Sequence, residues 1–179
     1  MPPYTYDHSA PNIHALLSSL TTHNISHTLD LATRNSKSNT PWSPAPPTHT
    51  PLIVFFPQTT LETSIVLKAC NERRIAVTPF SGGTSFGQAL GNSEGGVCIS
   101  FEKMKSVVEV HEDDMDVVVQ PGLGWVELNA SLEGKGLFFP VDPAPGARIG
   151  GMVRLPSPSV ANEIVLGCDT YADRKQSAR

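Results

Sequence analysis

The sequence has few cysteines, and none of them lie close together. The three are Cys70, Cys98 and Cys168, an odd and widely spaced set that fits neither a disulfide framework nor a CxxC zinc site. The six histidines include no HExxH or similar ligand pair, so we expect no bound metal. This usage of cysteine favours a reducing, intracellular location.

Long apolar runs and an excess of positive charge are also missing. No apolar run approaches the ~18 residues that cross a bilayer, and the N-terminus lacks a secretory signal pattern. The net charge of −4 gives no field that would attract nucleic acid or an anionic membrane, so we expect neither as a partner. Asp7 comes early and Arg34 is the first arginine, which is not the composition of a mitochondrial presequence.

The 179 residues that remain to be explained have the composition of an ordinary globular domain. With 39% hydrophobic residues, the chain can bury one core of its own. Residues 11–20 predict a short amphipathic helix, and five prolines between Pro41 and Pro51 predict an extended connector. We therefore expect residues 1–50 to form a helix and connector, with the folded domain starting at residue 51.

Short apolar runs, separated by glycine and proline, begin at residue 51. They predict a strand over 52–56, a helix over 61–73 that Thr60 caps, and a strand over 75–78, together a βαβ unit. The right-handed crossover of such a unit puts the loop after residue 78 at the carboxyl edge of the sheet, where open α/β folds bind ligands. We expect the helix to turn these side chains inward: Leu61, Ile65, Val66, Leu67 and Cys70.

The second half of this domain is richer in strands. Residues 97–101, 106–110 and 116–120 predict strands, and the last two form a hairpin whose acidic turn leaves His111 exposed to solvent. A second helix is expected over 125–133, followed by an extended segment over 137–140. Strands with two interspersed helices indicate the α+β class.

A glycine-rich turn directly after the strand at 75–78 is the most informative segment. Its residues, after Pro79 and Phe80, are Ser81, Gly82, Gly83, Thr84 and Ser85. Adjacent glycines remove the Cβ atoms that keep a bulky anion from the backbone and let successive N–H groups converge, while the hydroxyls add donors. A diphosphate fits that description, although Gly and Ser also dominate ordinary surface turns.

Two other nucleotide motifs are excluded. The turn has no Lys for a P-loop, and Gly122-Leu123-Gly124 has Glu127 where a Rossmann fingerprint needs its third glycine. Neither ATP nor NAD is favoured.

Several segments together resemble a known family, the FAD-linked oxidases with a PCMH-type flavin domain, and within it the D-lactate dehydrogenase (cytochrome) and glycolate oxidase branch. The resemblance covers about 51–153. It is carried by CNERRIAVTP, PFSGGTSFG, GGVCISFEKM, VVVQPG with WVELN after it, and GLFFPVDPAPGARIGGMV. It implies a PCMH-type α+β domain of two small subdomains.

The resemblance also implies the cofactor, FAD, and the residues that bind it. The turn from Ser81 to Ser85 would wrap the FAD diphosphate, with Pro79 starting the turn. The family's PxDP element near the flavin matches Pro140, Asp142 and Pro143, and its IGG element matches Ile149, Gly150 and Gly151. For Pro140 and Pro143, a role in stiffening the loop is an alternative to direct contact.

The chain departs from the family pattern in two places. Gln88 stands where the family has a glycine, with Gly87 one residue earlier. After residue 153 the family continues with a Gly/Ser/Thr-rich segment that also touches FAD, but here the sequence is Arg154-Leu155-Pro156-Ser157-Pro158. We expect the flavin domain to be incomplete at its C-terminal end, through a truncated or altered reading frame, and 154–179 to be a poorly ordered tail.

The predicted function is therefore the FAD-binding portion of a flavin-dependent oxidoreductase similar to D-lactate dehydrogenase, which oxidises a D-2-hydroxy acid. The family's cap domain and later catalytic histidines have no counterpart, so no catalytic residue is nominated and the electron acceptor stays unknown. The resemblance implies a mitochondrial location, with the cytoplasm as the alternative. Two other interpretations are a non-catalytic remnant that binds no flavin, and a small FAD reductase of the cell-wall precursor type, against which the segment 136–153 argues.

Overall fold

The computed structural model describes residues 5–38, 49–84, 95–141, 143–154, 169–171 and 173–174. The chain forms two compact units, Met1–Lys103 and Met104–Arg179. Both combine helices with strands, in agreement with the expected α+β class and its two small subdomains.

A four-stranded sheet organises the first unit. Its order is β1-β2-β4-β3, with bounds His27–Thr28, Ile53–Phe55, Val97–Ser100 and Val77–Phe80. The strands β2, β4 and β3 are parallel and β1 is antiparallel. The expected β2–helix–β3 connection is present, but β4 lies between the two strands.

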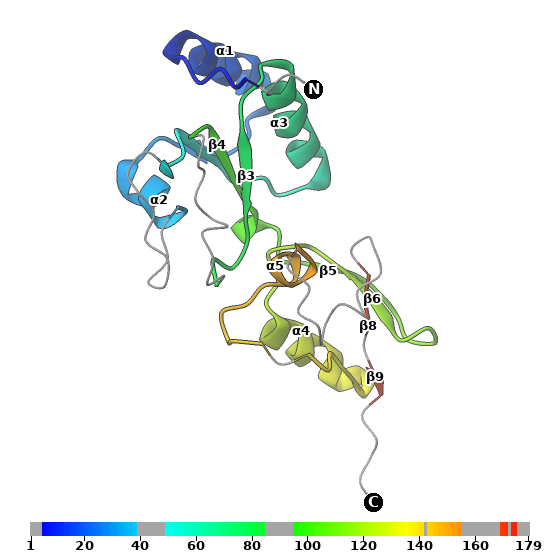
Figure 1. The fold of residues 1–179 in the computed structure, drawn as a ribbon. Helices are drawn as coiled ribbons and strands as arrows, with labels where there is room; N and C mark the ends of the chain where they lie inside the picture. The colour runs from blue at the N-terminus through cyan, green and yellow to red at the C-terminus, as the bar shows by residue number, and fades with distance from the viewer. Residues whose placement is uncertain are drawn as a thin grey trace, which may run out of the picture. The chain divides into compact units, whose positions relative to one another are not determined.

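The buried strands alternate between the two faces of this sheet. Ile53, Phe55, Val97 and Ile99 belong to one apolar cluster, while Val54 and Cys98 belong to another. Two helices supply the rest of the first cluster, α1 (Ala10–Leu20) and α3 (Thr60–Glu72). A short helix, α2 (Leu31–Ser36), lies on the other side of β3 and β4 from α3 (Figure 1).

The residues before Pro51 belong to this unit rather than preceding it. Leu16 and Leu20 of α1 are buried in the same core as β2 and β4. The Arg34 Nε of α2 donates a hydrogen bond of 2.7 Å to the Pro51 carbonyl. The sequence predicted α1 but neither α2 nor β1, because both are too short for periodicity to mark them.

The helix α3 begins one residue earlier than expected and uses a different cap. Thr59, not Thr60, accepts the bond from the Glu62 N–H, at 3.1 Å, and the Glu62 carboxylate accepts from the Gln58 N–H. Leu61 and Leu67 were expected inside but are 70% and 45% exposed, because the buried face runs along Val66, Ala69 and Cys70.

The second unit packs two helices against an antiparallel sheet. Its sheet has the order β5-β6-β8, with bounds Val107–His111, Asp116–Val119 and Asp169–Tyr171. The hairpin β5–β6 was predicted, and its register shifts between Val107 and Glu109, as at a β-bulge. The helices are α4 (Trp125–Leu132) and α5 (Ile149–Arg154), and their Leu128, Leu132 and Ile149 share a core with Val117.

The segment beyond residue 154, which we expected to be poorly ordered, contributes two short described strands. β8 pairs with β6, and β9 (Asp173–Arg174) pairs with β7 (Leu137–Phe138). Residues 155–168 lie outside the described part of the chain.

Candidate functional site

The glycine-rich turn lies at the carboxyl edge of the parallel strands. It follows β3 directly, and β3 runs parallel to β4, as does β2, so all three strands end at this edge. This is the position that the sequence predicted for it, although β3 itself spans Val77–Phe80 rather than 75–78 and includes Pro79. Loops at this edge of a parallel sheet are where open α/β folds bind ligands.

The backbone of the turn has the conformation that an anion site needs. Gly83 has φ of +66°, in the left-handed region that glycine adopts without strain. Within the described part of the chain, the amides of Gly82, Gly83 and Thr84 donate no hydrogen bond to other backbone. No neighbouring carbonyl in that part competes with an anion for these donors. Ser85 and Gln88 lie outside the described residues.

A lysine that the sequence did not single out fixes the side chain immediately before the turn. The Lys37 Nζ, at the end of α2, lies 4.6 Å from the centroid of the Phe80 ring and 6.0 Å from that of Phe56. The side chain of Lys37 is only 12% exposed and pairs with the Glu102 carboxylate at 2.5 Å. The buried Ser100 hydroxyl donates to the same carboxylate at 3.1 Å. The entry to the turn is thus held by a network of charged and polar groups.

The two cysteines that the structure describes take no part in ionic or metal chemistry. Burial raises the pKa of Cys70 and of Cys98 to about 12, so both thiols stay protonated at neutral pH. Among the described residues, no three His, Cys, Asp or Glu side chains gather as a metal site would require.

The second unit carries the PxDP segment on a loop after β7. Pro140 is exposed and Pro143 half-buried, whereas Asp142 lies outside the described residues. The buried Phe139 precedes the loop, and a turn from Ala144 to Ala147 ends it, closed by a backbone bond of 2.8 Å.

The IGG residues open α5, and each has a different environment. Ile149 is 2% exposed and packs in the core, with its N–H bonded to the Leu123 carbonyl. A Cβ on Gly150 would lie 2.6 Å from the Pro121 Cβ and 2.9 Å from the Pro121 carbonyl oxygen. A Cβ on Gly151 would meet no atom within 4 Å. Packing of the chain itself therefore requires glycine at 150, while Gly151 leaves its backbone open to a ligand.

His111 is not an isolated histidine in a solvent-facing turn, as the sequence suggested. It is the last residue of β5, half-exposed, with Nε2 3.0 Å from the Glu109 carboxylate and Nδ1 2.5 Å from that of Asp116. Hydrogen bonds to Glu109 and Asp116 raise the pKa of His111 above its ordinary value. The alternation of β5 puts Glu109 and His111 on one side of the strand, a signal that the expected turn boundary concealed.

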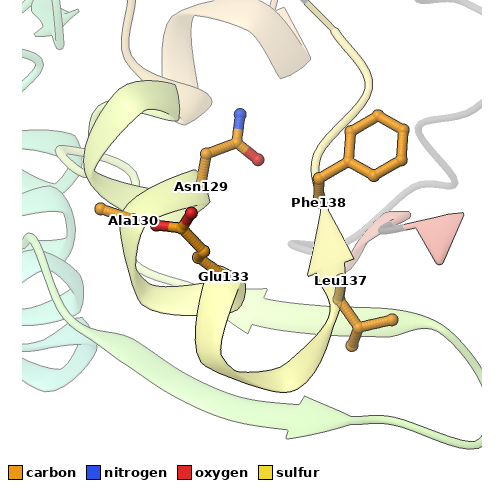
Figure 2. Close-up of a pocket in the computed structure, with 5 residues that line it drawn as sticks. All are labelled: Asn129, Ala130, Glu133, Leu137 and Phe138. Carbon is orange, nitrogen blue, oxygen red and sulfur yellow. The ribbon is translucent and has the colours of Figure 1, made fainter. Parts of the chain in front are cut away.

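A depression of about 380 Å³ lies beside the helix of this unit. It is lined by Asn129 and Ala130 of α4, by Glu133 in the turn after it, and by Leu137 and Phe138 of β7 (Figure 2). None of these five residues was predicted as a site residue.

Comparison with known proteins identifies the family. Residues 51–155 match the family described as FAD binding domain. The match covers more than half of the chain, so the chain belongs to this family, and FAD is the cofactor of its members.

Individual relatives agree with the narrower resemblance. Over 102 residues the chain is 51% identical to D-lactate dehydrogenase (cytochrome), mitochondrial, of Arabidopsis thaliana, a match that covers 57% of this chain and 18% of the relative. It is 34% identical over 94 residues to glycolate oxidase subunit GlcD of Bacillus subtilis, covering 52% of this chain and 20% of that protein. The chain thus spans about a fifth of the length of these curated relatives.

The fold matches solved flavoenzyme-like structures. One is alkyldihydroxyacetonephosphate synthase, with a TM-score of 0.69 at 17% identity, covering 83% of this chain and 32% of that one. This likeness agrees with the PCMH-type fold expected from the sequence. In the part of the chain that the structure describes, no helix combines the length and apolarity needed to cross a membrane.

Proposed function

We propose that this chain is the FAD-binding portion of a flavoenzyme that oxidises a D-2-hydroxy acid. The turn at 81–85 holds the FAD diphosphate through its backbone amides and the hydroxyls of Ser81, Thr84 and Ser85. The observation that carries the proposal is the left-handed Gly83 in a turn at the carboxyl edge of a parallel sheet. The identity of 51% to a D-lactate dehydrogenase supports the substrate class.

The second unit is proposed to supply the contacts to the flavin end of the cofactor. Pro140, Asp142 and Pro143 form one wall, and Gly151 lets the backbone approach because nothing occupies the space above its Cα. Bound FAD would supply the acceptor for the hydride that leaves the hydroxy-acid carbon. The residues of this chain bind and orient the cofactor and exclude water from it.

The mitochondrion is the proposed location. The Arabidopsis relative carries that location in its name, and the chain shares about half of its residues with it over the matched segment. Fractionation of cells that express a tagged copy tests this point, and a cytosolic signal would contradict it.

Titration of the purified chain with FAD, followed by the visible absorption of the flavin, tests the cofactor assignment. The wild-type chain is expected to bind FAD. Gly83→Ala is expected to bind it about a hundredfold more weakly, because the added Cβ displaces about two charge-assisted hydrogen bonds. A chain that ignores FAD would instead be a remnant that binds no flavin.

The control variant is Gly136→Ala in the other unit. Gly136 also has a left-handed φ, +68°, and a Cβ there would meet nothing within 4 Å. Both substitutions strain the backbone by a similar amount, of order 1 kcal/mol, but only Gly83→Ala is expected to weaken FAD binding. Equal losses in both variants would show that strain, and not the anion site, is responsible.

A further inference from the structure

Helix α4 carries the sequence Trp125-Val126-Glu127-Leu128-Asn129, and three of its side chains hold the loop that contains Pro140 and Pro143. Trp125, Glu127 and Asn129 each form a hydrogen bond with the segment from Phe139 to Arg148. We call these three side chains the α4 clamp. Leu128 points into the core, and Val126 is 51% exposed.

Asn129 holds the start of the loop at two points. Its Oδ1 accepts a hydrogen bond of 2.6 Å from the Phe139 N–H, and its Nδ2 donates one of 3.2 Å to the Phe139 carbonyl. The side-chain amide therefore satisfies both backbone groups of one residue, as a neighbouring β-strand would. Phe139 is 4% exposed, so these groups have little access to water and need partners from the protein.

Trp125 and Glu127 hold the other end of the loop. Trp125, one helical turn before Asn129, has its indole Nε1 3.4 Å from the Ala144 carbonyl. Glu127 accepts from the Arg148 guanidinium and from the Gly124 N–H, both at 2.8 Å. The second bond caps α4 and is the main reason that the pKa of Glu127 is lowered.

We propose that the α4 clamp is a positioning device for the flavin-contacting loop, with Asn129 as its main positioning residue. The clamp grips both ends of the segment 139–148 and leaves the prolines between them to face the cofactor. The inference rests on the proposed function, since it assigns a role to residues beside the flavin loop. It gives the segment WVELN, so far only a mark of resemblance, a physical task in which the exposed Val126 alone has no part.

The substitutions Asn129→Ala and Val126→Ala test this proposal on the same helix. Hydrogen–deuterium exchange of the apoprotein measures the clamp directly. Asn129→Ala is expected to speed exchange in the peptide around Phe139 and to leave the strands β2 and β4 unchanged. Val126→Ala is expected to change neither. Unaltered exchange at Phe139 in Asn129→Ala would overturn the clamp whether or not the chain binds FAD.

Titration with FAD measures the consequence for the cofactor. Asn129→Ala is expected to raise the Kd for FAD by about tenfold, because two hydrogen bonds that fix the loop are lost. At saturating FAD its visible circular dichroism should differ from wild type, since a displaced loop changes the surroundings of the bound flavin. A purely structural role would lower the melting temperature but leave that spectrum unchanged, and this result would overturn the positioning role.

A larger substitution guards against a fold defect. Asn129→Leu has nearly the volume of asparagine but can form neither bond, so it should reproduce both changes of Asn129→Ala. If the wild-type chain shows no FAD binding while Asn129→Ala still opens Phe139 to exchange, the clamp stands and the proposed function fails. Wild-type affinity and wild-type flavin spectrum in both Asn129 variants would refute the positioning role.

Discussion

Alanine substitution at the adjacent residues Gly150 and Gly151 separates packing from ligand approach in α5. A Cβ at 150 would lie 2.6 Å from the Pro121 Cβ and 2.9 Å from its carbonyl oxygen, whereas ordinary contacts begin near 3.4 Å. Pro121 also accepts the Gly150 N–H at 2.9 Å, so the two backbones cannot separate without breaking that bond. The structure offers no flexible side chain that could move aside.

The magnitudes favour a clear difference between the two variants. Overpacking of this kind costs about 1–3 kcal/mol, and alanine recovers about 0.5–1 kcal/mol relative to glycine in a helix. We therefore expect Gly150→Ala to destabilise the protein by about 1–2 kcal/mol. Gly151→Ala, which meets nothing within 4 Å, should be neutral or stabilise the protein by up to about 1 kcal/mol.

Urea unfolding followed by the fluorescence of Trp125 measures this difference. The chain contains two tryptophans, so both variants are made in a Trp42→Phe background that leaves only the probe in the second unit. The midpoint should fall for Gly150→Ala and stay or rise for Gly151→Ala, with equal slopes. Equal stability of the two variants, or the reverse order, would refute the packing argument.

Three further predictions concern single residues elsewhere. Leu16→Ala should lower the free energy of unfolding by about 2–5 kcal/mol in urea titrations, because Leu16 is fully buried in the first core; a loss below that of a surface substitution would detach α1 from the unit. Glu127→Gln should destabilise the protein at neutral pH, and the deficit should shrink as the pH falls below the ordinary carboxyl value of 4.5, since a lowered pKa contributes stability only above it; a deficit independent of pH would contradict this. In NMR titrations the pKa of His111 should exceed 6.5 and fall toward it in Asp116→Asn, and the stability that this pair contributes should be lost as the pH rises through the raised pKa; an unchanged titration in that variant would remove Asp116 as a cause.

The sequence predicted the long elements of the fold because their patterns are local. The helices α3 and α4 and the hairpin β5–β6 each show a clear period of apolar residues, and each forms within a few residues of its expected bounds. The position of β4 between β2 and β3 depends on pairing between distant segments, which no local pattern records. The inclusion of α2 in the first unit likewise depends on contacts such as that of Arg34 with the Pro51 carbonyl.

The candidate site was predictable where backbone conformation alone defines it. Gly83 is left-handed, as a pair of glycines after a strand indicates. The contributions of Lys37 and Asn129 were not predictable, because each acts on residues more than nine positions away through a single side chain. Gly150 shows the opposite case, in which a glycine assigned to the cofactor by resemblance is required by Pro121.

Competition among three ligands is the most direct test of the central claim, that the turn at 81–85 holds a diphosphate. Isothermal calorimetry on the wild-type chain would compare FAD, ADP and FMN, of which the first two contain a diphosphate. The account predicts that FAD binds, that ADP displaces it, and that FMN binds at least about tenfold more weakly because it lacks the second phosphate. Equal affinity for FMN and FAD, with no competition from ADP, would contradict it.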